Sequence, residues 1–333
     1  MSNFKETHLM QVNPSELTPS QQRTRQLIER NLGPILKIAE IQGGLVSRVY
    51  RVYGEKQKGI VKIRGKTFAK IPSIQMDPNE VRYEYAAIQF LSQVEPSIFP
   101  HPLAYDAEES MILMTDIMPD EQTLEKRLEN KEVSLGDMIT LGKTIGRLHM
   151  KLAKFQDSMR EGHDDEDYEE GLFYRLGGNR NNPTLNAIAE TLKQLPKQII
   201  IADLSPKNIG RGKDGQVTIC DLESCYRGNT IFSLGYLAGH VLLHNLGDYP
   251  KATSLINGLL EGYNSENLDV EVDSLLLKRI CLATTLYRLD NPIIPYALSL
   301  SQEEKTRKTA TSIKLLEEQS MSWDRLVKKM VSA

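Results

Sequence analysis

The feature that most constrains this chain is a short β-unit inside a helical half. Residues 198–201 (QIII) predict an apolar strand that leads into Asp203, and residues 217–220 (VTIC) predict a second strand that leads into Asp221. An Asp-Gly pair between them is a strong hairpin signal. Asn208 lies in the loop after Asp203. Because strand ends present their side chains at an edge, we expect two carboxylates and an amide in one compact group.

This group predicts phosphoryl transfer. The reaction needs a carboxylate that orients the attacking hydroxyl and oxygen ligands that hold Mg²⁺ on the phosphates. The D-x-x-x-x-N spacing of Asp203 and Asn208, followed by the strand-end Asp221, matches the catalytic loop and the metal aspartate of kinases. The alternative is that Asp203 and Asn208 only cap a loop; the strand–hairpin–strand context favours the catalytic interpretation.

The order of elements predicts an α+β fold with a β-rich N-terminal lobe and a mainly helical C-terminal lobe. A helical extension over residues 1–33 precedes the β-rich lobe, which ends at residue 116. Residues 117–333 are mainly helical; over residues 134–152, apolar side chains recur at spacings of three and four. Strands are predicted at 35–41, 49–53, 60–63, 67–71 and 110–115.

A glycine turn in the first lobe is a candidate phosphate-binding element. Gly43, Gly44 and Ser47 lie between two predicted strands, where backbone N–H groups can approach phosphates. Such turns also occur between strands without any ligand, so the turn alone is a weak signal.

A lysine and a glutamate complete the candidate nucleotide site. Lys70 ends the predicted strand 67–71, and a lysine there supplies a point charge for phosphates. Glu84 borders the apolar face of the following helix, where an unpaired acid is disfavoured. We expect a Lys70–Glu84 ion pair; Lys62, in the preceding strand, is the rival lysine, and Glu84 as a simple edge acid is the alternative.

With these residues in place, the chain resembles the aminoglycoside phosphotransferase/choline kinase superfamily of small-molecule kinases. The resemblance covers residues 35–243 and depends on the order of several short segments. These are GGLVSRVYRV, TFAKI, RYEYAAIQFL, SMILMTDI, LGKTIGRLH, ADLSPKNIG and ICDLES.

The resemblance implies a protein-kinase-like two-lobed fold, ATP as co-substrate and Mg²⁺ as cofactor. It implies a nucleotide-binding lobe over residues 1–116, and a catalytic loop and acceptor site within 117–333. Asp203 would be the catalytic base, Asn208 and Asp221 would bind the metal, and Glu223 would support a second metal or lie at the surface. The implied nucleotide-binding residues are Gly43, Gly44, Ser47, Lys70 and Glu84, with backbone groups of Met114, Thr115, Asp116 and Ile117 reading the adenine.

Several positions depart from the family pattern. Ile201-Ala202 replaces the usual His-Gly before the aspartate, Ser205 replaces a second histidine, and Ser233 replaces an aspartate that orients the loop. The alternative to an active phosphotransferase is therefore a divergent pseudokinase that acts as a nucleotide-binding regulatory module. A protein kinase is disfavoured because no A-P-E-like segment follows Asp221.

An acidic run points to the acceptor. Residues 161–170 (EGHDDEDYEE) lie between the predicted helix 134–152 and the catalytic loop. An acidic rim attracts cationic acceptors such as aminoglycosides or choline, and the alternative is a solvated loop. RGNTIFSLGYLAG is similar to a segment of methylthioribose kinase-like enzymes, which would make the acceptor a neutral sugar.

Composition excludes other classes. The formal charge of −3 argues against a nucleic-acid binder with a broad basic surface. No apolar run approaches the ~18 residues of a membrane span, and the N-terminus lacks the features of a secretory signal. Cys220, Cys225 and Cys281 lack C-x-x-C spacing, which is typical of reduced thiols in a cytoplasmic protein. No motif specifies an oligomeric state.

Overall fold

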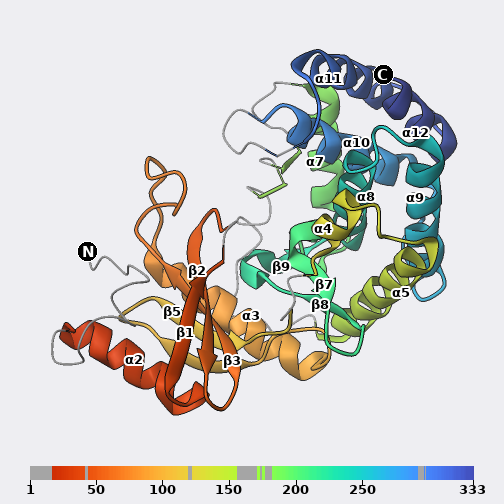
Figure 1. Cartoon of the computed structure of the whole chain (residues 1–333). Coiled ribbons are helices and arrows are strands. Elements are labelled where there is room, and N and C mark those ends of the chain that lie inside the picture. Colours follow the sequence, from red (N-terminus) through yellow and green to blue (C-terminus); the bar gives the residue numbers. More distant parts are fainter. Residues whose placement is uncertain are drawn as a thin grey trace. The chain divides into compact units, whose positions relative to one another are not determined.

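The structure is a computed structural model that describes residues 17–41, 44–118, 122–155, 171–172, 175–176, 182–291, 296 and 298–333 (Figure 1). The chain divides into two compact units, Met1–Pro119 (unit 1) and Asp120–Ala333 (unit 2). Unit 1 holds the larger sheet and unit 2 is mostly helical, which confirms the predicted α+β class. The predicted lobe boundary after residue 116 lies close to this division.

Unit 1 is built on a five-stranded antiparallel sheet with the order β1-β2-β3-β5-β4. β3 lies in the middle, with Lys62 opposite Val49 of β2 on one side and Ile112 of β5 on the other. The strands are β1 (Ile35–Glu40), β2 (Ser47–Gly54), β3 (Lys58–Arg64), β4 (Pro102–Asp106) and β5 (Met111–Thr115).

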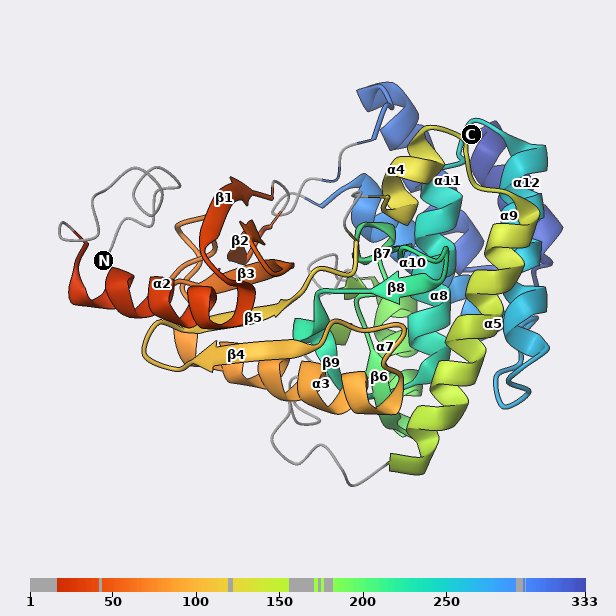
Figure 2. The ribbon, with the colours of Figure 1, turned by 60° about the horizontal axis from the view of Figure 1, so that its bottom comes forward.

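Helix α2 (Pro19–Leu32) packs on one face of this sheet (Figure 2). A capping box starts the helix: Thr18 Oγ1 accepts a hydrogen bond from Gln21 N, and Gln21 Oε1 accepts one from Thr18 N. The apolar face of α2 joins a buried cluster with the sheet, made of Ile28, Leu32, Ile38, Tyr50, Val52, Val61, Met111 and Leu113.

Helix α3 (Val81–Val94) packs on the opposite face. Val61 belongs to the core under α2, and strand side chains alternate between faces. Its neighbour Lys62 therefore points to the other face, where it meets Glu84 of α3. The capping side chain of Asp77 accepts a hydrogen bond from Asn79 N at 2.9 Å, ahead of a short 3₁₀ turn (Pro78–Glu80).

The strand predicted at residues 67–71 is wrong. Only an isolated bridge joins Thr67 to Gln75, and the segment closes on itself through Phe68 N to Ile74 O at 3.0 Å. Pro72 removes a ladder donor at the end of the segment. Moreover, β3 already has β2 and β5 on its two sides, so no edge of β3 remains for another strand.

Unit 2 surrounds two small sheets with helices. The helices are α4 (Leu124–Glu129), α5 (Leu135–Leu152), α7 (Pro183–Gln194), α8 (Thr230–Leu243), α9 (Tyr249–Asn264), α10 (Leu275–Leu289), α11 (Gln302–Leu316) and α12 (Trp323–Ser332). The strands are β6 (Gln198–Ile201), β7 (Ile209–Arg211), β8 (Val217–Ile219) and β9 (Cys225–Gly228). In the described ranges, none of the helices combines the length and the apolar character needed to cross a bilayer.

Helices α5 and α9 lie side by side with their backbones in close approach (Figures 1 and 2). A Cβ added to Gly142 would lie 2.1 Å from Leu259 O, and one added to Gly262 would lie 2.1 Å from Ile139 O. Both glycines are therefore required by the packing. α5 begins at the capping Ser134, as the apolar pattern predicted.

Candidate functional site

Strand β6 carries the chain to Asp203. β6 pairs with β9 in antiparallel register, and Ala202 N continues the pairing to Ser224 O at 2.9 Å. The Ser233 hydroxyl donates to Ile201 O at 3.0 Å. Ser233 replaces the loop-orienting aspartate of the family pattern, and here its side chain braces the end of β6 directly before Asp203.

The hairpin of β7 and β8 brings Asn208 next to Cys220, the residue directly before Asp221. The Asn208 side-chain amide donates to Asp203 O at 3.1 Å, which ties the loop to the end of β6. β7 and β8 then pair in antiparallel register, and Cys220 N donates to Asn208 O at 2.9 Å. The predicted Asp-Gly turn closes the hairpin, with Gly215 at φ 78°. Asp203, Asn208 and Asp221 are thus gathered within unit 2, as the sequence predicted.

Asp221 has an unusual backbone. It lies in the left-handed region at φ 60° and ψ 66°, immediately before the short 3₁₀ turn Leu222–Ser224 that contains Glu223. A non-glycine residue in this region is uncommon, although aspartate tolerates it better than most. Such strained residues cluster at functional sites. Carboxylate and amide oxygens are the ligands that Mg²⁺ prefers, so Asn208, Asp221 and Glu223 are a donor set that fits this ion.

The Asp203 carboxyl is ionised and has an unused oxygen. Burial alone would raise its pKa, but the positive charges of Lys207, Arg175 and Arg288 outweigh burial and hold the pKa well below its ordinary value. Lys207 Nζ lies 4.0 Å from Asp203 Oδ2. In the described part of unit 2, Asp203 Oδ1 is buried and has no hydrogen-bond partner. An unsatisfied buried acceptor is costly, and a hydroxyl group of a bound molecule would satisfy it.

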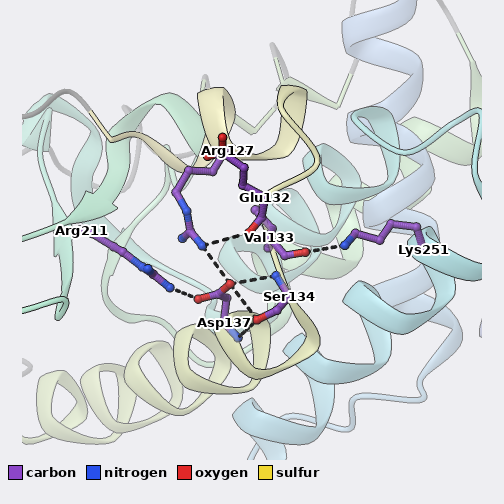
Figure 3. Close-up of polar contacts among 7 residues, drawn as sticks. All are labelled: Arg127, Glu132, Val133, Ser134, Asp137, Arg211 and Lys251. Carbon is purple, nitrogen blue, oxygen red and sulfur yellow. Dashed lines mark hydrogen bonds and ion pairs between the residues drawn. The ribbon is translucent and has the colours of Figure 1, made fainter.

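A polar network anchors the hairpin to α4 and α5 (Figure 3). Asp137, in the first turn of α5, accepts from Arg211 of β7 and, at 2.8 Å, from Arg127 of α4. The same carboxylate accepts from the backbone and hydroxyl of Ser134. Lys251 of α9 donates to Val133 O at 2.6 Å beside this cap. The network fixes β7, and with it the position of Asn208, the residue directly before this strand.

In unit 1 the partner of Glu84 is Lys62. Lys62 Nζ lies 3.0 Å from Glu84 Oε1 and 2.8 Å from Oε2, and both side chains are buried. The predicted Lys70–Glu84 ion pair is wrong, because Lys70 is exposed in the loop after β3. The signal that favours Lys62 is local: it is a lysine in the middle of an apolar strand, on the face opposite Val61.

The glycine turn and Lys70 do come together. Gly44, Ser47 and Lys70 line one cavity of about 70 Å³ in unit 1. Lys70 N donates to Leu45 O at 3.2 Å, which holds the loop against the turn. A Cβ at Gly44 would lie 2.5 Å from Ser47 O, so this position needs glycine. Gly43 lies outside the described residues.

The four predicted adenine-reading residues follow or end β5. Met114 lies within β5. Thr115 N donates to His101 O at 2.9 Å, so the Thr115 amide already has a hydrogen-bond partner within unit 1. Asp116 pairs with the buried Arg51 at 2.7 Å, which fixes the chain just before Ile117. The pairing of Arg51 was not predicted; its position in an alternating strand gave no distinctive signal.

The acidic run at residues 161–170 lies outside the described residues, so the structure leaves its role as a prediction. Sequence reasoning also missed Arg175 and Arg288, whose charges act on Asp203. Neither arginine belongs to a recognisable motif, and they come from parts of unit 2 far apart in the chain.

Known proteins were compared with the chain. No protein-family model matches it, and no curated protein is significantly similar to it in sequence. The solved structure of the amicoumacin kinase hAmiN in complex with AMP-PNP, Ca²⁺ and Ami has a TM-score of 0.57 at 16% identity, over 93% of this chain and 99% of that one. A choline/ethanolamine kinase family protein from Mesorhizobium loti has a TM-score of 0.53 at 15% identity, with the same coverage of 93% and 99%.

A putative aminoglycoside phosphotransferase from Ralstonia eutropha is similar to the same extent, with a TM-score of 0.53 at 12% identity over 92% of this chain and 97% of that one. At these identities the likeness concerns the fold. The chain has the α+β kinase-like fold of the aminoglycoside phosphotransferases and choline/ethanolamine kinases, which confirms the fold that the resemblance predicted.

Proposed function

We propose that the protein is an ATP-dependent phosphotransferase that acts on a hydroxyl group of a small molecule with the help of Mg²⁺. The observation that carries the proposal is Asp203: an ionised carboxylate at the end of a braced strand, with Oδ1 buried and unbonded, and with Asn208 tied to its backbone. The fold shared with small-molecule kinases supports the same reaction class.

Groups in unit 1 would bind the nucleotide. A buried lysine held by a glutamate is the arrangement that places a fixed positive charge on ATP phosphates in kinases, and Lys62 with Glu84 provides it here. The turn at Gly44 and Ser47 would approach the phosphates with backbone N–H groups. Backbone groups after β5, at Asp116 and Ile117, would read the adenine.

Groups in unit 2 would act on the acceptor. Asp203 Oδ1 would accept a hydrogen bond from the attacking hydroxyl and orient its oxygen toward the γ-phosphorus. Since its pKa is depressed, Asp203 is a weak base and would take the proton only late, as the new O–P bond forms. This timing suits the loose transition state of phosphoryl transfer. Lys207, beside Asp203, would hold the carboxylate in place.

Mg²⁺ would be held by Asn208 and Asp221, with Glu223 as a further candidate, and when bound it would neutralise charge on the phosphate oxygens. The acceptor classes consistent with the proposal are the aminoglycosides, amino alcohols and sugars. A nucleotide-binding regulatory module is the competing function, and turnover separates the two.

The direct test is ATP turnover with a panel of hydroxyl acceptors, comparing the wild-type protein with Asp203→Asn and Asp214→Asn. Asp203→Asn should lower kcat by ~10²–10⁴-fold, the usual scale for loss of a general base. Asp214→Asn is the matched control, because Asp214 is exposed in the turn of the same hairpin. An unchanged kcat in Asp203→Asn would refute this residue as the base, and nucleotide binding without turnover of any acceptor would favour the regulatory module.

A further inference from the structure

Arg288, on α10, is a buried cation with neutral partners. Its side chain is 9% exposed, its Nη2 donates to Tyr236 OH at 2.6 Å, and its Nε donates to His240 Nε2 at 3.0 Å. His240 Nδ1 lies 2.9 Å from Tyr236 O, an acceptor, so Nδ1 carries the proton and Nε2 accepts. His240 is therefore neutral, and neither partner balances the charge of Arg288.

Arg175 is a second cation at the same place. Its Nη1 donates to Tyr226 OH at 2.8 Å and its Nη2 to Ser224 Oγ at 2.9 Å, both neutral groups. The guanidinium groups of Arg175 and Arg288 lie 6.0 Å and 5.8 Å from the centre of the Tyr236 ring. The two arginines thus flank one buried aromatic ring.

The charges around Asp203 do not balance. In the ranges of the chain described above, no carboxylate lies within 4.0 Å of Arg175 or Arg288. Both arginines and Lys207 act on the carboxylate of Asp203, and the carboxylate of Asp221 also acts on Lys207, so three cations meet two carboxylates. Buried charges are normally paired, so the surroundings of Asp203 have a net positive charge that an anion would offset.

The same place offers unused hydrogen-bonding groups. Each guanidinium has five N–H donors, of which two are used by the neutral partners named above. In the part of unit 2 described here, the fully buried Ser205 Oγ also has no partner. A guanidinium fork matches the oxygens of carboxylates and phosphates.

We infer that the acceptor carries an anionic oxygen group, a carboxylate or a phosphate ester, which Arg175 and Arg288 bind while its hydroxyl meets Asp203. This inference rests on the phosphotransferase function proposed above. It departs from the cationic acceptor that the acidic run favours, because a cation beside Asp203 would meet two arginines and Lys207. The arginines would set the specificity, and Asp203 would orient the hydroxyl.

The test measures oxyanion binding to the full-length protein saturated with AMP-PNP and Mg²⁺. Inorganic phosphate, malonate and tetramethylammonium are titrated at constant ionic strength, and thermal stability is followed. Phosphate or malonate should stabilise the loaded protein and tetramethylammonium should not; which anion binds distinguishes a phosphate-bearing from a carboxylate-bearing acceptor. If neither anion stabilises the loaded protein, or if tetramethylammonium does so instead, the inference is overturned.

Variants connect the effect to the two arginines. Arg288→Gln and Arg175→Gln should weaken anion binding by ~10–100-fold, the scale of a lost charged hydrogen bond. The more conservative Arg288→Lys and Arg175→Lys keep the charge and guard against variants that fail to fold; loss of the fork should still weaken binding by about tenfold. Arg147→Gln is the matched control, since Arg147 is 55% exposed on α5 and pairs with Glu266.

The outcomes separate this inference from the proposed function. If AMP-PNP itself does not stabilise the protein, the phosphotransferase proposal fails. If AMP-PNP stabilises the protein but all the arginine variants bind the anions as the wild type does, only the anionic acceptor is refuted.

Discussion

At the scale of single residues, burial separates two lysines that the sequence offers as partners of Glu84. Lys62 and Glu84 are both buried, and they satisfy each other at 2.8 Å. Lys70, which lies in the TFAKI segment that resembles the kinase superfamily, is exposed. Burial therefore distinguishes the two lysines, and their substitutions should differ accordingly.

Replacing Lys62 by Met should destabilise the protein by about 3–5 kcal/mol, because it leaves the Glu84 carboxylate buried without its cation. Lys70→Met should change stability by no more than about 0.5 kcal/mol. Urea unfolding of both variants measures the difference. The double variant Lys62→Met/Glu84→Gln should recover part of the loss, and equal effects of the two lysine substitutions would contradict the assignment.

His149 predicts a pH dependence of stability. Its Nδ1 lies 2.9 Å from Tyr263 OH, and burial lowers its pKa from 6.5 to about 3. Between these pH values the unfolded chain holds a proton that the folded chain does not. Above about pH 6.5 this difference does not lower the free energy of unfolding. As the pH falls below 6.5, the free energy of unfolding decreases by about 1.4 kcal/mol per pH unit.

His149→Asn should make the free energy of unfolding depend less steeply on pH. Between pH 5 and 6.5, its slope should fall by the equivalent of up to one bound proton. The wild-type protein, measured in parallel, gives the reference slope. Urea titrations at several pH values measure both slopes; a wild-type slope in His149→Asn would show that this histidine does not titrate in the unfolding reaction.

At the scale of elements, glycine decides how α5 and α9 meet. Gly142 and Gly136 both lie in α5, but only Gly142 is in contact with the backbone of α9. A Cβ on Gly136 would meet only the Ser134 hydroxyl, at 3.8 Å. The same substitution in one helix should therefore have opposite effects at the two positions.

Gly142→Ala should cost about 3 kcal/mol or more, because overpacking against backbone atoms cannot relax by a side-chain movement. Gly136→Ala should stabilise the protein by about 0.5–1 kcal/mol, the helix propensity that alanine adds. Thermal or urea unfolding of the two variants measures this contrast. A loss of stability in Gly136→Ala, or none in Gly142→Ala, would show that the two helices are not packed in this way.

At the scale of the whole molecule, a nucleotide that binds the folded chain and not the unfolded chain should raise the overall stability. Mg·ATP at about 100 times its Kd should stabilise the protein by about 2.7 kcal/mol. Adding EDTA should remove most of this effect, since the phosphate charges would then be uncompensated.

Asp221→Asn should reduce the difference between Mg·ATP and ATP with EDTA, which differential scanning fluorimetry measures directly. Asp214→Asn again serves as the control from the same hairpin. An equal stabilisation by ATP with and without the metal in the wild-type protein would argue against a metal ligand at Asp221.

The features that could be predicted from the sequence are those formed by residues close together in the chain. The caps at Thr18, Asp77 and Ser134 and the hairpin between β7 and β8 follow from residues close together in the chain. The gathering of Asp203, Asn208 and Asp221 was predictable for the same reason: strand ends and a tight turn leave few alternatives. Their chemical roles remain predictions.

The sequence by itself determined the α+β class, the helix caps and the local geometry of the hairpin between β7 and β8, because hydrogen bonds between near neighbours fix these local features. Only the tertiary structure decided that Glu84 pairs with Lys62, since that depends on which face of the sheet α3 covers. Only the tertiary structure brought Arg175 and Arg288 to Asp203. These are contacts between residues far apart in the chain, where the electrostatic and packing energies depend on burial that no local pattern encodes.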